Sequence, residues 1–440
     1  MQLSSSIARL ARGAAARPLA AAQPQRGLSA AAAAASGDPR RRPLPTPAHL
    51  LEQIAYTEPP NLRVVTLNRP EALNALTLPM LRRLTRLLLQ WEKNESVGAV
   101  VIGTDSKAFC AGGDVAQVYR DGLAEGKGSA AQLDFFAEEY AFNRLLATST
   151  KPTVALLDGI VMGGGAGVSV HGDFRVATER SLFAMPETAI GLFPDVGASH
   201  FLPRLAAGPA VGAYVALTGA RLGWREMLSA GLATHALPSS RLPALLAHLG
   251  DMGPTATRGA IDAALADYEY AYYYGGATQA DADAADPVGY QRRAAEIERV
   301  FGAVFEGKDG ETSGGGDGME GVMARLREVE GGAGGGGEEA REWATATATT
   351  LGKMSPTSLK VTLRLLAEGA AKEGVEQCLA MELGVVTRMM QGEDFYEGIR
   401  AMLIDKDHAP KWAETGLEAV SDAAVDEYFA KPVKIADLRR

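Results

Sequence analysis

Cysteines, metal-binding histidine patterns and long apolar runs are all scarce in this 440-residue chain. Only two cysteines are present, Cys110 and Cys378, which excludes a disulfide framework and fits a reducing compartment. The six histidines form neither an HxH nor an HExxH pattern, so the sequence predicts no metal site. No apolar run reaches the length of about 18 residues that a transmembrane helix needs, and we expect no membrane contact.

The chain also has fewer positively charged than negatively charged side chains. The chain has 44 lysines and arginines against 53 aspartates and glutamates, a formal net charge of -9. An acidic balance argues against a surface that neutralises nucleic-acid phosphates, so we expect no nucleic-acid partner. Hydrophobic residues make up 47% of the chain, which is enough to bury a large core.

Aspartate, glutamate and lysine are absent from residues 1–37, which are rich in alanine and contain four arginines. Leu3, Ile7 and Leu10 form one apolar stripe of a helix. This composition predicts a transit peptide and import into the mitochondrial matrix; a chloroplast transit peptide and an alanine-rich tail without a targeting role are the alternatives. Residues 38–48, with four prolines, are expected to be a linker.

Alternating strand and helix patterns in residues 49–250 predict an α/β domain. Strands are expected at residues 63–67, 97–103, 153–157, 174–177 and 182–185, and helices at residues 78–93, at 130–147 and from 198 to about 250.

The rest of the chain, residues 251–440, is expected to be a helical C-terminal region with one insertion. Glycine-rich tracts at residues 314–318 and 331–337 flank a short charged helix candidate at residues 322–329. Because such tracts cannot repay their ordering entropy by burial, we expect flexible insertions in a surface loop at about residues 306–338.

Two glycine-rich turns each follow an expected strand. One is Lys107–Asp114, with the sequence KAFCAGGD, and the other is Asp158–Gly167, with the sequence DGIVMGGGAG. Glycine lets backbone N–H groups approach a ligand closely, and a helix starting at Gly164 would add free donors and the positive end of its dipole. Two such N–H groups directed at one carbonyl oxygen would form an oxyanion hole. Tight turns and close packing alone are the alternative.

Two carboxylates, Glu187 and Asp195, lie eight residues apart in an otherwise apolar segment, and each follows a proline. Burial in such surroundings raises the pKa of a carboxyl group, which can then act as acid, base or nucleophile. Their alternative role is to cap turns.

The residue spacing of this chain does not match three other motifs of enzyme active sites. The glycines match neither a dinucleotide-binding nor a P-loop pattern. Residues 167–171, GVSVH, miss the GxSxG nucleophile elbow by their last residue, and Ser169 and His171 would not face each other on a helix. Cys110 is expected to contribute its backbone N–H, with its thiol incidental.

Several motifs in order resemble the enoyl-CoA hydratase/isomerase (crotonase) superfamily: LNRP with NAL at residues 67–76, AFCAGGD, MGGGAG and MPETAIGLFPDVG. Longer strings, including KMSPTSLK at residues 353–360 and EGIRAMLIDKD at residues 397–407, resemble its branch of acyl-CoA thioester hydrolases. The resemblance implies a crotonase-like ββα spiral core with a helical C-terminal region, and an acyl-CoA substrate.

The resemblance also assigns roles. It implies oxyanion-hole amides at Cys110 and Gly164, a catalytic Glu187, and acid–base work or substrate binding by Asp195. Glu139 matches a substrate-binding glutamate of the hydrolase branch, although its sequence context alone favours an ordinary exposed helix residue. The second catalytic glutamate of hydratases is replaced here by Gly167.

The activity implied is hydrolysis of 3-hydroxyisobutyryl-CoA, and of 3-hydroxypropionyl-CoA, in valine breakdown, with no metal or redox cofactor. The two acyl groups differ by one methyl, which the sequence does not resolve. Alternatives are an enoyl-CoA hydratase or isomerase and a structural subunit of the mitochondrial ribosome. A homo-oligomer is possible.

Overall fold

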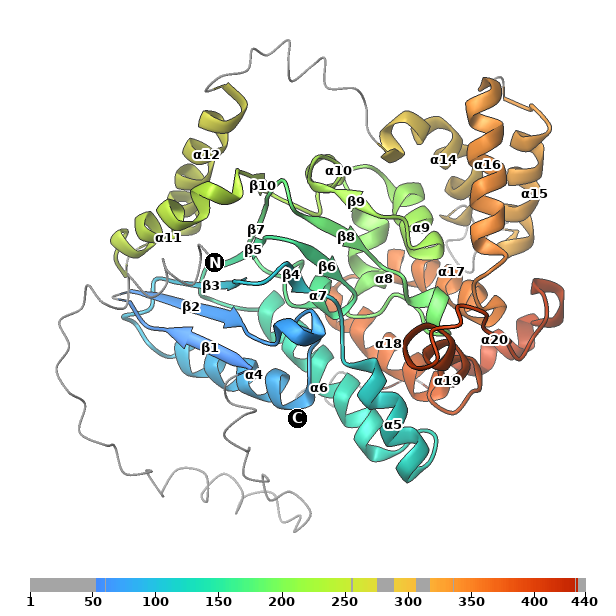
Figure 1. The fold of residues 1–440 in the computed structure, drawn as a ribbon, viewed down its shortest axis with the longest axis horizontal. Helices are drawn as coiled ribbons and strands as arrows, with labels where there is room; N and C mark the ends of the chain where they lie inside the picture. Colours follow the sequence, from blue (N-terminus) through green and yellow to red (C-terminus); the bar gives the residue numbers. More distant parts are fainter. Residues whose placement is uncertain are drawn as a thin grey trace.

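The computed structural model describes residues 53–433, except residues 60, 255, 275–288, 306–316, 335 and 432. The expected transit peptide at residues 1–37 and linker at residues 38–48 lie outside the described residues. Figure 1 shows a sheet region that is covered by helices on both sides and joined to a helical C-terminal region.

The strands form two sheets. They are β1 (Ile54–Thr57), β2 (Leu62–Leu67), β3 (Ala99–Thr104), β4 (Ala108–Cys110), β5 (Thr153–Leu157), β6 (Ile160–Met162), β7 (Phe174–Ala177), β8 (Leu182–Ala184), β9 (Leu222–Gly223) and β10 (His235–Ala236). The larger sheet has the order β1-β2-β3-β5-β7-β10 and the smaller one β4-β6-β8-β9. Only β1 and β9, which pair with β2 and β8, run antiparallel to their neighbours.

From β3 to β8, successive strands alternate between the two sheets. β3, β5 and β7 enter the larger sheet, and the strand after each of them, β4, β6 or β8, enters the smaller one. The chain therefore advances as a spiral of two strands followed by a connection, which confirms the expected ββα core. Each passage from the larger to the smaller sheet spans only a few residues, so the glycine turns that follow β4 and β6 come together at one place.

The helices of the sheet region are α4 (Leu78–Glu92), α5 (Val115–Glu125), α6 (Ala130–Ala147), α7 (Gly164–Gly167), α8 (Ala198–Phe201), α9 (Pro209–Thr218), α10 (Trp224–Ala230), α11 (Leu242–Asp251) and α12 (Arg258–Tyr274). Helix α4 shows why these segments are helical. Thr77 caps it, and its buried residues Leu81, Leu84 and Leu88 recur every three or four positions.

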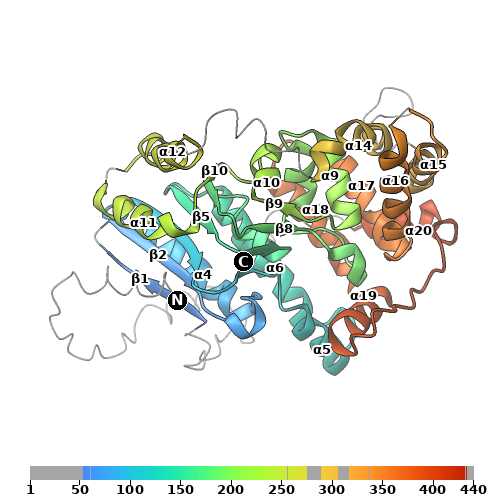
Figure 2. The ribbon, with the colours of Figure 1, turned by 45° about the horizontal axis from the view of Figure 1, so that its top comes forward.

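The C-terminal region consists of α14 (Ala294–Phe301), α15 (Gly318–Glu330), α16 (Gly337–Leu351), α17 (Pro356–Ala370), α18 (Val375–Met389), α19 (Asp394–Ile399) and α20 (Asp422–Phe429). Helices α17 and α18 pack on α8, and α18 also packs on α6. Both views place α14, α15 and α16 away from α11 and α12 (Figures 1 and 2).

The end of the core predicted at residue 250 is wrong, because helix α12 also belongs to the core. Helix α12 continues the cover of the larger sheet that α11 begins, because Ile261 and Leu265 join α11 leucines in one apolar cluster with alternate residues of the strands. The core thus extends through α12.

Within the insertion predicted at about residues 306–338, the helix candidate at residues 322–329 is confirmed, but the expected flexible surface loop needs correction where it is described. Residues 318–330 form helix α15, whose Met319, Val322 and Leu326 are fully buried. This apolar stripe packs against α16, and α16 itself begins at Gly337. Burial of the stripe supplies the stabilisation that the neighbouring glycines lack. The remaining insertion residues, 306–316 and 335, lie outside the described residues.

Five short strands were also not expected: β1, β4, β6, β9 and β10. β9 and β10 interrupt the segment after residue 198 that was predicted as helical. They span two residues each, too few for any alternation of apolar and polar residues to be recognised.

Candidate active site

The two glycine turns meet beside the N-terminus of α7. A Cβ added to Gly164 would lie 3.1 Å from the amide nitrogen of Gly113, a tight contact that glycine avoids. Helix α7 begins at Gly164 as predicted, but it is a single turn of four residues, and its dipole is correspondingly small. The free first-turn N–H of Gly164 is the feature that matters here.

The geometry moves the first predicted donor from Cys110 to Gly113. Cys110 lies inside β4, which pairs with β6. Around Gly113 the backbone bonds are made by its neighbours, since the Gly112 carbonyl accepts from Leu76 and the Asp114 amide donates to Leu76. Gly113 N–H donates to no described backbone group, and it faces Gly164. Gly113, in place of Cys110, is therefore the candidate donor that pairs with Gly164.

The Cys110 side chain is unsuited to nucleophilic chemistry. It is fully buried, its sulfur lies 3.5 Å from the carbonyl oxygen of Gly112, and burial raises the pKa of the thiol to about 12. A thiol with that pKa is protonated at neutral pH. The Ser169 hydroxyl is similarly engaged, because it donates to the Gly165 carbonyl at 2.8 Å.

Three buried carboxyl groups form a cluster, two of which lie beside the paired glycine turns. Glu139 comes from α6, Glu187 begins the short 3-10 helix Glu187–Ile190, and Asp195 lies in the following loop. A Cβ on Gly164 would collide with Glu139 Oε1, and a Cβ on Gly163 would lie 2.6 Å from Glu187 Oε1. The three side chains are 2%, 5% and 4% exposed, so Glu139 is not the exposed helix residue that its sequence context suggested.

Burial shifts the titration of all three groups. It is the largest cause that raises the pKa of Glu139 and Glu187 well above the usual value, and the charge of Asp195 adds to both shifts. Burial also raises the pKa of Asp195 to about 7, although a hydrogen bond from Tyr140 opposes the shift. Carboxyl groups this close do not all ionise together. The cluster therefore holds both a proton donor and a proton acceptor near neutral pH.

The loop that carries Asp195 is fixed on several sides. The Tyr140 hydroxyl donates to Asp195 Oδ2 at 2.8 Å. Glu382, on α18, accepts from the amide of Gly197 at 2.7 Å and from the amide of Ser199 at 3.0 Å. Val196 has a φ of 55°, a strained value for a β-branched residue that surrounding contacts must maintain.

Sequence reasoning missed Tyr140 and Glu382 as parts of this site. A signal was available for Glu382, because it interrupts the apolar run LAMELGVV on a helix and a buried charge is usually paired or functional. Tyr140 carries no such signal, since a tyrosine on an apolar helix is more often an ordinary core residue.

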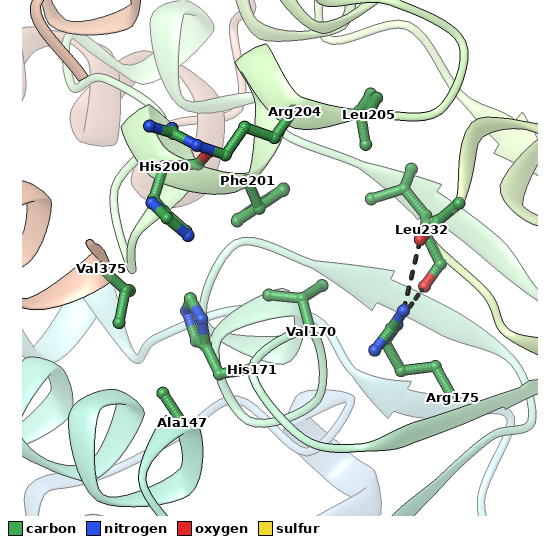
Figure 3. A pocket seen from close by; sticks show the side chains of 11 residues that line it. Ala147, Val170, His171, Arg175, His200, Phe201, Arg204, Leu205, Leu232 and Val375 are labelled. Atoms are coloured by element: carbon green, nitrogen blue, oxygen red, sulfur yellow. Dashed lines mark hydrogen bonds between the residues drawn. The ribbon is translucent and has the colours of Figure 1, made fainter. Parts of the chain in front are cut away.

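A cavity of about 360 Å³ borders the same loop (Figure 3). His171 lines it and lies 2.7 Å, through Nε2, from the Val196 carbonyl oxygen, where it acts as the donor. The nearby guanidinium groups are occupied by backbone carbonyls: Arg175 donates to Leu232 and Arg204 to Lys372. We therefore regard this cavity as part of the support of the loop.

Within the described ranges there is no cluster of three side chains suited to binding a metal ion. A search of the same residues finds no helix long and apolar enough to cross a membrane.

The fold and this arrangement of amides and carboxylates agree with the family match. Residues 62–429 match the family model described as enoyl-CoA hydratase/isomerase, and the chain belongs to that family. Within it, the chain is 43% identical over 390 residues to 3-hydroxyisobutyryl-CoA hydrolase 1 of Arabidopsis thaliana, covering 88% of this chain and 94% of the relative. It is 42% identical to the mitochondrial 3-hydroxyisobutyryl-CoA hydrolase of Danio rerio, covering 83% and 86%.

Solved structures show the same fold. A carnitinyl-CoA dehydratase from Mycobacterium thermoresistibile superposes with a TM-score of 0.71 at 30% identity, over 86% of this chain and 97% of the other. An enoyl-CoA hydratase from Rhodobacter sphaeroides 2.4.1 gives a TM-score of 0.69 at 32% identity, with the same coverage.

Proposed function

We propose that this chain hydrolyses 3-hydroxyisobutyryl-CoA, and the closely related 3-hydroxypropionyl-CoA, to the free hydroxy acid and CoA. The observation that carries the proposal is the pair of free glycine amides, Gly113 and Gly164, beside the buried Glu187 and Glu139. The names of the relatives support the same substrate. The setting is valine breakdown in the mitochondrial matrix, with residues 1–37 as the import signal, and no metal or redox cofactor takes part.

The amides of Gly113 and Gly164 bind the thioester oxygen and stabilise the negative charge that develops on it. Each such donor contributes about 2.7–4 kcal/mol to transition-state stabilisation in well-studied cases. Because the site is buried, water does not compete for the N–H groups.

Glu187 supplies the electron pair by one of two routes. In the first, its carboxylate attacks the carbonyl carbon and the C–S bond breaks; water then opens the resulting anhydride and returns a proton to the carboxyl cluster. In the second, Glu187 takes a proton from a water molecule that attacks directly. In both, CoA leaves as a thiolate and takes a proton from the carboxyl cluster that Asp195 shares with Glu139 and Glu187. Glu139 binds the substrate's 3-hydroxyl group.

Hydration is the second candidate, because both solved neighbours are titled as hydratase or dehydratase. Gly167 counts against it, since the second carboxylate that hydration employs is missing at that place.

The proposal is tested by incubating the purified full-length chain with 3-hydroxyisobutyryl-CoA, measuring free CoA with a thiol reagent and identifying the acid by mass spectrometry. Stoichiometric release of both products supports hydrolysis, and the absence of free thiol would contradict it.

A further inference from the structure

Asn143 lies one helical turn from Glu139 on the same face of α6. Residues four apart on a helix are neighbours on its surface, and α6 packs directly on α7. Glu139 contacts Gly164, and Asn143 contacts Gly167, one turn further along α7. Asn143 thus lies in the interface between α6 and α7, one helical turn from the proposed oxyanion hole.

The amide of Asn143 takes the space that a side chain at position 167 would fill. A Cβ on Gly167 would lie 2.8 Å from Asn143 Nδ2 and 2.9 Å from Val196 Cβ. Position 167 is where the resemblance to hydratases expects a second catalytic carboxylate. A neutral amide therefore replaces a titratable group there.

Both ends of this amide lack a partner. Asn143 is 0% exposed, and neither Oδ1 nor Nδ2 forms a hydrogen bond with any described group. An unsatisfied buried polar group is unfavourable, and native proteins retain few of them. The other buried polar atoms without partners include Glu139 Oε1 and Glu187 Oε2, which belong to the proposed active site.

We propose that Asn143 is a substrate-positioning residue that binds a hydroxyl-type oxygen during hydrolysis. Its Oδ1 accepts and its Nδ2 donates, so the matching partner must both donate and accept. Two partners share this chemistry: the 3-hydroxyl group of the substrate and the attacking water. The inference rests on the proposed hydrolase function and extends its site by one residue.

The test compares the wild type with Asn143→Leu, which is similar in volume but apolar. Two substrates are used: 3-hydroxyisobutyryl-CoA and isobutyryl-CoA, which lacks the hydroxyl group. We expect kcat/KM for the hydroxylated substrate to fall by about tenfold to a hundredfold. A loss confined to that substrate identifies the 3-hydroxyl as the partner, whereas an equal loss on both identifies water. Unchanged kcat/KM on both substrates would overturn the proposal.

Thermal melting separates positioning from a structural role. Because Asn143 has no hydrogen-bond partner among the described residues, Asn143→Leu should melt at or above the wild-type temperature. The matched control on the same helix is Gln132→Met: Gln132 is equally buried, but it donates to the Val118 carbonyl at 2.8 Å and accepts from the Gly128 amide at 2.9 Å. This control should melt lower and keep the wild-type kcat/KM.

The remaining outcomes are also decisive. A lower melting temperature for Asn143→Leu, with equal activity loss on both substrates, would assign Asn143 to the scaffold and refute the proposal. Asn143→Ala, which removes the amide without adding bulk, provides the same comparison if the leucine variant does not fold. A wild type that releases no CoA refutes the proposed function instead, and the melting comparison then still shows whether Asn143 lacks an internal partner.

Discussion

Replacing Glu187 by glutamine removes the proposed nucleophile or base while preserving its shape. The carboxyl group is 5% exposed, its Oε2 has no hydrogen-bond partner in the part of the chain that the structure describes, and its Oε1 lies beside Gly163. A neutral amide of the same size therefore fits without breaking an internal bond. General-base catalysis contributes about 10²–10⁴ to a rate, so we expect kcat of Glu187→Gln to fall by about that factor.

The assay is steady-state CoA release from 3-hydroxyisobutyryl-CoA, together with inhibition by free CoA as a measure of binding. Inhibition by CoA should remain close to wild type, since Glu187 acts on the acyl end. Any residual activity should titrate at lower pH, because the charge of Glu187 is one of the causes that raise the pKa of Glu139. Glu179→Gln, at an exposed position, is the matched control. Near-wild-type kcat in Glu187→Gln would refute the assignment of its role.

Four further variants test other parts of the account. Tyr140→Phe removes the hydrogen bond that lowers the pKa of Asp195, so the corresponding limb of the pH–rate profile should move to higher pH; an unmoved limb would contradict this. Burial raises the folded-state pKa of Asp195 from 3.8 to about 7, so its contribution to stability is complete below pH 3.8 and is lost as pH rises toward 7. Asp195→Asn should therefore melt higher than the wild type at pH 8, with the difference shrinking toward pH 4; a constant difference would be inconsistent with the shift. Glu382→Gln places an amide N–H against one of the two backbone donors, either Gly197 or Ser199, which should cost about 1–3 kcal/mol in the free energy of unfolding by denaturant titration; unchanged stability would argue against this anchoring. Cys110→Ala should retain wild-type kcat, because the thiol is buried and protonated, and a large loss would restore a role for its side chain.

Local patterns predicted most of the longer elements because each of these carries its own signal. The helix expected at residues 130–147 is α6, and the strand expected at residues 153–157 is β5. The two-residue strands β9 and β10 have no comparable periodicity, so they become strands only through their neighbours. Helix α15 was underestimated because its flanking glycines hid an apolar stripe that α16 buries.

The motifs of the candidate site could be predicted from the sequence, but several of its contributing residues could not. Gly164, Glu187 and Asp195 stood out as unusual residue types in their segments, and the structure brings them together. The shift from Cys110 to Gly113 could not be seen in the sequence, because it depends on which amide the strand pairing leaves free. Asn143 and Tyr140 acquire significance only through contacts with the distant residues Gly167 and Asp195.

The most direct test of the central claim is the ratio of two rates in one preparation of the full-length chain. CoA release from 3-hydroxyisobutyryl-CoA and hydration of crotonyl-CoA are measured at the same enzyme concentration and pH. With two glycine amides, Glu187 and no carboxylate at Gly167, the chain should release CoA rapidly and hydrate crotonyl-CoA slowly. Rapid hydration without thiol release would show a hydratase instead and contradict the proposed hydrolase function.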